Sequence, residues 1–369
     1  MSSPKLIIYL SSLSVLLALS FKASAGVYGF DDISPYTQEE NTLTMEYLPD
    51  KIENYRALMR ENLLMLIDYA RSHNPDFQII SHEGQYLLNK SKWEYDLDGY
   101  NQVQAKPDKA EDPYFLFNSQ QTPTEPSENS MAYRYLNSIN AVVLNNLYCG
   151  NGKEEDVTIN HNLGLISIDH CSNEEALDKA IMHSLLDHKI IYAFTELKTA
   201  FQDLSSQPLI NDSAKNINKV SDAKNITFLL NDTQYDTKEQ MINSISSSNY
   251  DIVVISPLFH HRSPFTPEDV ERMQIKRNGA TRLILAQINV SEISTKDYFW
   301  KTNWRLGNPS WILRPSFSSS NQFITQYWHP QWRKILSRHF KDIVASGYNG
   351  VFFTGLENNQ YFEHLTPLE

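Results

Sequence analysis

The sequence lacks the features that mark several common functional classes. Its two cysteines do not form a CxxC pair, which excludes a cysteine-based zinc site. It holds no basic cluster, and its net charge of −12 argues against nucleic acid as a partner. The GxSxG, P-loop, HExxH and dinucleotide-binding motifs are all absent. Nucleophilic hydrolases, nucleotide-binding enzymes and zinc proteases therefore lose their main support.

Long apolar runs are also scarce, and the longest lies at the N-terminus. Lys5 precedes an apolar run over 6–21, and Ala23-Ser24-Ala25 follows it. This order predicts a signal peptide over 1–25 and a secreted or periplasmic protein with no stable membrane insertion after cleavage. The run is slightly short for a membrane span of ~20 residues. A retained N-terminal anchor stays open as the alternative, because Lys22 lies close to the cleavage site.

Residues 26–369 are predicted to form a single domain with an N-terminal extension, a length typical of one α/β barrel. Short apolar runs rich in β-branched and aromatic residues alternate with helix-like stretches, which is typical of a parallel sheet. The runs are apolar throughout, so both faces are expected to be buried. Eight strands with intervening helices favour a (β/α)8 TIM-type barrel over an open sheet. The eight runs are 77–81, 139–147, 163–169, 190–194, 225–230, 251–256, 282–288 and 350–354.

Helix signals fall between these runs. A capping sequence at 172–175 opens a helix that extends to His188, and a second one at 266–269 places a proline in the first turn. A helix over 330–345 is expected to end at Gly347.

Two long segments interrupt the alternation after the first and the seventh strand, over 89–130 and 289–325. Both are predicted to be loops on the barrel face where active sites form. Aromatic residues cluster around the last two strands, and flat rings of this kind stack on sugars. We expect Trp300 and Tyr327 to be exposed, whereas inward packing is the alternative for Trp328 and Trp332. The cluster comprises Trp300, Trp304, Trp311, Tyr327, Trp328 and Trp332.

Acidic residues occur at or just after five predicted strand ends, and on a barrel such residues face a shared mouth. Glycoside hydrolysis needs two carboxylates ~5 to 10 Å apart, one protonated and one ionised. The alternative for each acid is a solvated loop position or a pair with a nearby base. A net charge of −12 also suits a cationic ligand such as a polymer of amino sugars. The five acids are Glu83, Asp169, Glu196, Glu292 and Glu357.

Two further pairs of residues have more than one interpretation. Cys149 and Cys171 each follow a strand-like run, so they are expected either to form a disulfide across neighbouring strand ends or to remain buried thiols. Adjacent His260 and His261 follow the sixth strand, but neighbouring loop residues usually point apart, and no metal site is predicted.

Several segments together resemble the endo-α-1,4-polygalactosaminidase-like glycoside hydrolase family, from about residue 55 to the C-terminus. They read NYDIVVI at 249–255, AQINVSE at 286–292, YWHPQW at 327–332 and GYNGVFF at 347–353. Residues 69–80 and 221–225 look like its bacterial exported branch. The resemblance implies a (β/α)8 barrel that cleaves polymers containing α-1,4-linked galactosamine and needs no cofactor.

The chain departs from the family pattern at acidic positions. Where the family tends to read Gly-Glu-Ala-Glu, this chain has Asn289 to Glu292 and keeps only the last acid. The other positions where acids are usual carry Asn145, Ser256, His329 and Thr354. A hydroxyl does not replace a carboxylate in general acid-base catalysis near neutral pH.

Two hypotheses follow. The first is a glycoside hydrolase with Glu292 and Glu357 as its catalytic carboxylates, acting on an amino-sugar polysaccharide or oligosaccharide. The second is a catalytically inactive barrel that binds carbohydrate or acts as an effector or adaptor. The predicted substrate-binding residues are Glu83, Asp169, Trp300, Tyr327, Trp328 and His329.

Overall fold

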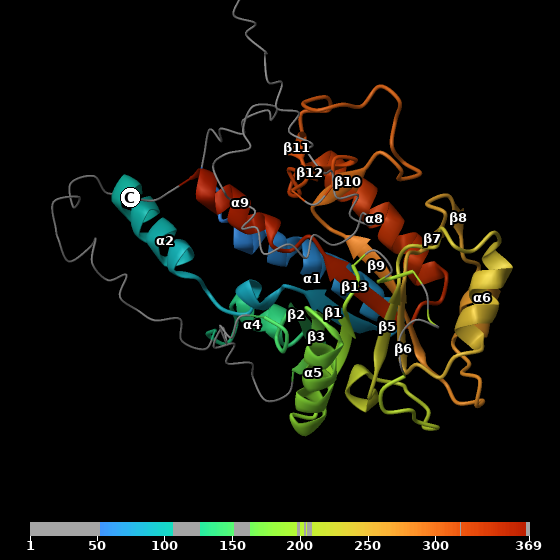
Figure 1. The fold of residues 1–369 in the computed structure, drawn as a ribbon. Coiled ribbons are helices and arrows are strands. Elements are labelled where there is room, and N and C mark those ends of the chain that lie inside the picture. The colour runs from blue at the N-terminus through green and yellow to red at the C-terminus, as the bar shows by residue number, and fades with distance from the viewer. Residues whose placement is uncertain are drawn as a thin grey trace, which may run out of the picture.

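The structure is a computed structural model that describes residues 52–105, 126–150, 163–197, 200–202, 204, 209–317 and 319–366. The predicted signal peptide over 1–25 lies outside the described residues. The centre of the molecule is a mixed α/β arrangement in which eight parallel strands form a nearly closed barrel sheet (Figure 1). The strands are β1 (Gln78–His82), β2 (Ala141–Asn145), β3 (Gly164–His170), β4 (Ile190–Phe194), β5 (Ile226–Leu229), β6 (Ile252–Ile255), β9 (Leu283–Asn289) and β13 (Gly350–Thr354).

All eight predicted apolar runs are strands of this sheet. Their order is β4-β3-β2-β1-β13-β9-β6-β5, and every paired neighbour runs parallel. The first and last strands of that order, β4 and β5, contact each other, although no hydrogen-bonded ladder joins these two described strands. From β1 the strands follow in chain order through β2 and β3 to β4, and across the seam from β5 through β6 and β9 to β13. This is the strand order of a barrel that is open at one seam.

The sheet is buried on both faces, as its apolar runs predict. One apolar cluster holds every second strand residue, including Ile80, Val143 and Phe352, together with side chains of the opposite wall such as Phe228. The other holds the alternate residues, including Ile79, and the apolar faces of the surrounding helices. Successive strand side chains point to opposite faces, so the first cluster fills the barrel and the second lies outside it.

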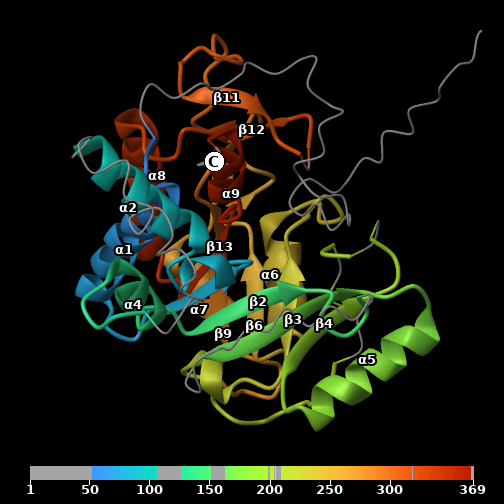
Figure 2. The same ribbon diagram turned by 90° about the vertical axis from the view of Figure 1, so that its left-hand side faces the viewer.

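Helices cover the outside of the sheet, and Figure 2 shows α1, α2 and α4 on one side of it and α5 on another. The helix predicted over 330–345 is confirmed as α8, and Gly347 after it has a φ of +79°. Asn173, not Ser172, caps α5 through its side chain, and Thr266 caps α7. The helices are α1 (Tyr55–His73), α2 (Lys92–Ala105), α4 (Met131–Leu136), α5 (Glu174–Leu186), α6 (Lys238–Ser246), α7 (Pro267–Met273), α8 (Pro330–Ala345) and α9 (Asn358–Leu365).

The segment predicted as a loop over 289–325 contains a second sheet. It has three antiparallel strands in the order β10-β12-β11, with β10 at Glu292–Ser294, β12 at Gln322–Thr325 and β11 at Ile312–Pro315. Both views show β11 and β12 beyond one end of the barrel strands (Figures 1 and 2). The other long segment, 89–130, contributes α2.

Cys149 and Cys171 form a disulfide, with their Cα atoms 5.1 Å apart. It joins the segments that follow β2 and β3.

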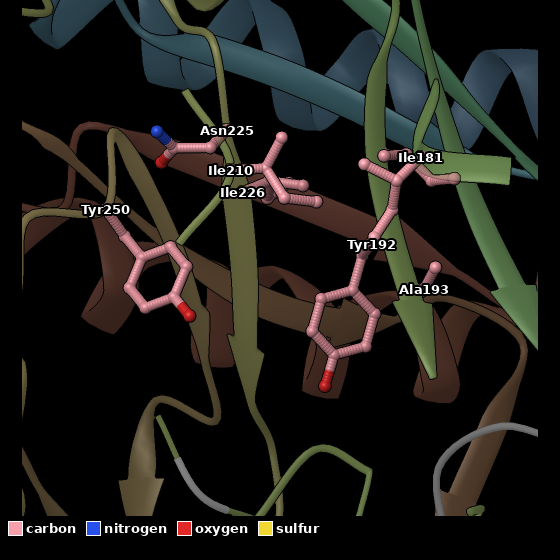
Figure 3. A pocket seen from close by; sticks show the side chains of 8 residues that line it. Ile181, Tyr192, Ala193, Ile210, Asn225, Ile226 and Tyr250 are labelled. Atoms are coloured by element: carbon pink, nitrogen blue, oxygen red, sulfur yellow. The ribbon is translucent and has the colours of Figure 1, made fainter. Parts of the chain in front are cut away.

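A small cavity lies nearby at the seam of the barrel, lined by Tyr192 and Ala193 of β4, Ile226 of β5 and Tyr250 (Figure 3). Among the described residues, no helix combines the length and apolar character needed to cross a membrane.

Candidate functional site

The candidate site lies where three neighbouring strands of the barrel sheet end. In the sheet, β13 lies between β1 and β9, so the carboxyl ends of these parallel strands are side by side. Glu83 directly follows β1, Glu357 comes three residues after β13, and Glu292 comes three residues after β9. The structure thus brings together three of the five acids that the strand ends predict.

Glu357 shows that these three carboxyl groups act on one another. Burial is the largest influence on its pKa, and the negative charges of Glu83 and Glu292 add to it, so the pKa rises to about 8. A nearby negative charge and a low-dielectric surrounding both disfavour ionisation of a carboxyl group. Glu357 is therefore mostly protonated at neutral pH and is able to donate a proton.

Glu292 is surrounded by uncharged hydrogen-bond donors. Ser316 Oγ at 2.8 Å and Asn358 Nδ2 at 3.2 Å donate to its Oε1, and Asn289 Nδ2 at 3.2 Å donates to its Oε2. Burial is the largest influence and leaves the pKa of the Glu292 carboxyl group above its ordinary value, although these three bonds favour the ionised form. The donors therefore solvate a carboxylate without neutralising it.

The loop after β9 and the loop after β13 are joined tightly beneath these acids. Asn289 Oδ1 accepts from the backbone N–H groups of Ser291 and Glu292 at 3.1 and 2.9 Å, which forms a side-chain turn that leads directly into Glu292. Ser291 Oγ donates to the Gly355 carbonyl at 2.5 Å. Gly355 has a φ of +77°, and a Cβ there would collide with Asn289 Oδ1 and lie 2.7 Å from Ser291 Oγ. The site thus needs glycine at 355.

Glu83 is held by residues of the first two strands. Its backbone has a φ of +51°, in the left-handed region that disfavours most residues. Asn145 Nδ2 donates to Glu83 Oε1 at 2.6 Å, and the Asn145 oxygen accepts from His82 Nε2 at 2.9 Å. The ring of His82 stacks on Phe352 inside the barrel. The resemblance expects an acid at position 145. Asn145 is not an acid, but its side chain holds the acid Glu83 in place.

Side chains that point into the barrel become polar at this end. His82 and Asn145 are two residues beyond inward-facing Ile80 and Val143, and Thr354 is two residues beyond Phe352. The hydroxyl of Thr354 accepts from Gln287 Nε2 at 3.2 Å. The side chains inside the barrel thus change from apolar to polar at the end of the strands where the three carboxyl groups lie.

Asp169 does not join this group. It follows inward-facing Ile168 on β3, so it lies on the outer face of the sheet. Its Oδ1 accepts from the backbone N–H groups of Tyr148 and Cys149, both at 2.7 Å, and its Oδ2 accepts from Ser167 Oγ. Asp169 therefore holds the turn that carries the disulfide. Glu196, after β4, is exposed.

The prediction that Tyr327 is exposed is wrong, because its side chain is fully buried. Its hydroxyl donates to the Tyr55 carbonyl at 2.8 Å, and its own carbonyl accepts from Asn62 Nδ2 at 2.8 Å. These two bonds attach the start of α8 to α1. Trp332 is also buried, as the alternative held, and its Nε1 donates to the Val290 carbonyl at 2.9 Å.

Trp300 and Trp328 are both half-buried. Trp300 stacks on Phe323 of β12, with ring centroids 5.5 Å apart. Trp328 packs against Tyr55 and Phe362 at 5.3 and 4.8 Å. Both rings therefore serve the packing of the second sheet and of α9, and their sugar contacts stay a prediction.

His329 is the N-cap of α8, and its Nδ1 accepts from the backbone N–H of Gln331 at 3.2 Å. Aspartate caps helices in the same way. The acid that the resemblance expects at 329 would therefore cap this helix, so its replacement by histidine removes no acid from the group around Glu357.

The histidines after β6 have structural contacts of their own. The backbone N–H of His260 donates to Asp232 Oδ2 at 2.6 Å, and both His260 and His261 have positive φ angles. Within the described part of the chain, no three His, Cys, Asp or Glu side chains gather as metal ligands would.

Sequence reasoning missed the neutral donors around Glu292. Asn289 begins a side-chain turn, and asparagine two residues before the bonded N–H is the usual signal for one. Ser316 and Asn358 had no such signal, because their proximity to Glu292 depends on how the second sheet and α9 pack.

The chain is similar to proteins of two distant organisms. It is 22% identical over 179 residues to an uncharacterized protein of the archaeon Methanocaldococcus jannaschii, which covers 47% of this chain and 50% of that protein. It is 22% identical over 111 residues to an uncharacterized protein of Deinococcus radiodurans, which covers 30% and 34% of the two chains. The chain thus spans half or less of the curated relatives it matches. No family model matches it.

Proposed function

We propose that the protein is a glycoside hydrolase that acts on galactosamine-containing polysaccharide. The observation that carries the proposal is the convergence of Glu83, Glu292 and Glu357, in which the pKa of Glu357 is raised to about 8 while neutral donors surround Glu292. A glycosidase needs one protonated and one ionised carboxyl group, and environments that separate the two pKa values identify the roles.

In this mechanism Glu357 is the general acid, which protonates the leaving glycosidic oxygen. Glu292 is the ionised partner, which either attacks the anomeric carbon or activates a water molecule. Asn289, Ser316 and Asn358 hold Glu292 in one orientation, so the carboxylate needs little rearrangement in the transition state.

The proposed fold is a (β/α)8 TIM-type barrel whose long segments after the first and seventh strands shape the cleft. The eight parallel strands in barrel order support it, and so does the site at their carboxyl ends, where barrel enzymes place their catalytic residues. Export to the periplasm or the exterior is proposed from residues 1–25 alone.

The substrate class is supported by the sequence resemblance and by charge. Three carboxyl groups in one site of a chain with a net charge of −12 favour a cationic sugar. A polymer of α-1,4-linked galactosamine has that charge along its length. Half-buried Trp300 and Trp328 are the proposed sugar-stacking residues.

The proposal is tested by incubating the purified protein with three polymers and measuring new reducing ends. The polymers are de-N-acetylated galactosamine polymer, its N-acetylated form and a neutral galactan. The expected result is release from the de-N-acetylated polymer, with less from the N-acetylated form and none from the galactan. Equal rates on all three would refute the charge argument, and no release from any would refute the hydrolase.

A non-catalytic carbohydrate-binding barrel is the second candidate, and one observation favours it. Val290 stands where the resemblance expects the first acid, and its side chain is fully buried in the core. Asn145, Ser256 and Thr354 supply no replacement charge. This candidate predicts polymer binding without any release of reducing ends.

A further inference from the structure

Arg314 on β11 is a buried cation beside the site. Only 7% of its surface is exposed. Its guanidinium carbon lies 3.8 Å from the centre of the Phe317 ring and 5.2 Å from the centre of the Tyr361 ring. These two rings meet edge to face, with their centroids 5.9 Å apart, so they fix the position of the guanidinium group.

The hydrogen-bonding capacity of Arg314 is largely unused. Its Nε donates to the Pro315 carbonyl at 3.2 Å. None of the ion pairs among the described residues includes it. Among the described residues, neither terminal nitrogen of Arg314 donates a hydrogen bond, and neither is a fully enclosed polar atom without a partner. They form the end of a planar fork that matches a carboxylate.

Other buried cations of the chain differ in this respect. Arg60 binds both oxygens of Glu94 and two backbone carbonyls. Lys276 pairs with Asp251, and the terminal nitrogens of Arg282 bind Ser248 and the Ile275 carbonyl. Burying a charge without a partner is costly. The open fork of Arg314 therefore points to a partner that the described residues do not supply.

Arg314 and Glu292 lie on the same face of the second sheet. Arg314 on β11 and Glu292 on β10 both pair with Ile324 of β12, so the three residues form one row across the second sheet. Residues aligned in this way project from the same face. Ser316, two residues after Arg314, donates to Glu292, and Tyr361 lies one helical turn beyond Asn358, which also does.

We propose that Arg314 is a subsite for the carboxylate of an acidic sugar unit next to the unit that is cleaved. Two strand spacings of about 4.8 Å separate the backbones of Arg314 and Glu292, which leaves room for a neighbouring sugar. The inference rests on the proposed function, and it makes the preferred polymer a mixed one, with an amino sugar at the carboxyl groups and an acidic sugar at Arg314.

The test is calorimetric binding of galacturonate, which carries a single carboxylate, with uncharged galactose as the reference ligand. Wild type is expected to bind galacturonate at least about 10-fold more tightly than galactose. Arg314→Gln is expected to lose that difference. Arg314→Lys keeps the charge and the stem over the rings but lacks the fork, so it should retain only part of it.

Arg277→Gln makes the same charge change at an exposed position and should bind as wild type does. The unfolding midpoint of each variant shows whether it is folded. If Arg314→Gln is not folded, Arg314→Lys is the variant that tests the subsite. Equal affinity of wild type for the two ligands, or full galacturonate affinity in a folded Arg314 variant, would overturn the subsite. Binding is the readout, so the result stands whether or not the protein cleaves a polymer.

Discussion

Replacing Glu357 with glutamine removes a carboxyl group that the fold holds protonated at neutral pH. Between its ordinary pKa of 4.5 and its raised pKa of about 8, the carboxyl group is ionised in the unfolded chain and protonated in the folded one. Unfolding then releases a proton, so the free energy of unfolding falls as pH rises through this window. Below pH 4.5 the group makes no difference, because it is protonated in both states.

The magnitude follows from the two pKa values. At about 1.4 kcal/mol per pKa unit, the full difference corresponds to about 5 kcal/mol at pH 9. The Glu357 side chain keeps partial contact with solvent, so we expect about half of this, or about 2 to 3 kcal/mol. Glutamine is nearly the same size and does not ionise. The variant should therefore gain stability over wild type by this amount as pH rises from 4.5 to 9.

The assay is urea unfolding of wild type and Glu357→Gln at intervals between pH 4.5 and pH 9. A hydrogen bond lost in the variant changes its free energy of unfolding by the same amount at every pH. The quantity that tests the prediction is therefore how the difference in free energy of unfolding between the two proteins changes with pH. Glu271→Gln, at an exposed position on α7, should run parallel to wild type. Glu83→Gln should shift the window to lower pH, because the Glu83 charge helps to raise the pKa of Glu357. Parallel curves for wild type and Glu357→Gln would refute the convergence of the three acids.

Substitutions at three further positions test individual structural contacts. Gly355→Ala should lower the free energy of unfolding, measured in urea, by at least about 2 kcal/mol, because alanine is strained at a φ of +77° and its Cβ meets Asn289. An unchanged urea midpoint would contradict the close packing of the loops after β9 and β13. Cys149→Ser opens a disulfide between residues 22 apart and should cost about 3 kcal/mol, and a loss below about 1 kcal/mol would show that the bond adds little. His329→Ala should lower stability by about 1 kcal/mol, while His329→Asp restores the cap and leaves turnover unchanged. A loss of turnover in the aspartate variant would contradict the capping role.

The barrel strands were predictable because burial on both faces leaves a clear trace in the sequence. Ile79 and Ile80 are both buried, one outside and one inside the barrel, and the same holds for Val142 and Val143. The same property hides the direction of each side chain. A run that is apolar throughout does not show whether its last acid points inward or outward, which is why Asp169 was grouped with the site.

The second sheet and the fate of the aromatic cluster were not predictable from local patterns. β10 has three residues and β11 and β12 have four each, and a segment of 17 residues separates β10 from β11. Whether Tyr327 is exposed depends on α1, which packs over the start of α8 from 265 residues away along the chain. The positions of Ser316, Asn358 and Arg314 around Glu292 depend on the same long-range packing.

Turnover of galactosamine polymer by variants of Glu292 and Glu357 shows whether these two carboxyl groups catalyse hydrolysis. We expect that wild type releases reducing ends, that Glu292→Gln and Glu357→Gln are each slower by at least about 100-fold, and that Glu271→Gln is unaffected. All variants should keep the wild-type circular dichroism spectrum. Wild-type rates in either Glu292→Gln or Glu357→Gln would contradict the two-carboxylate site.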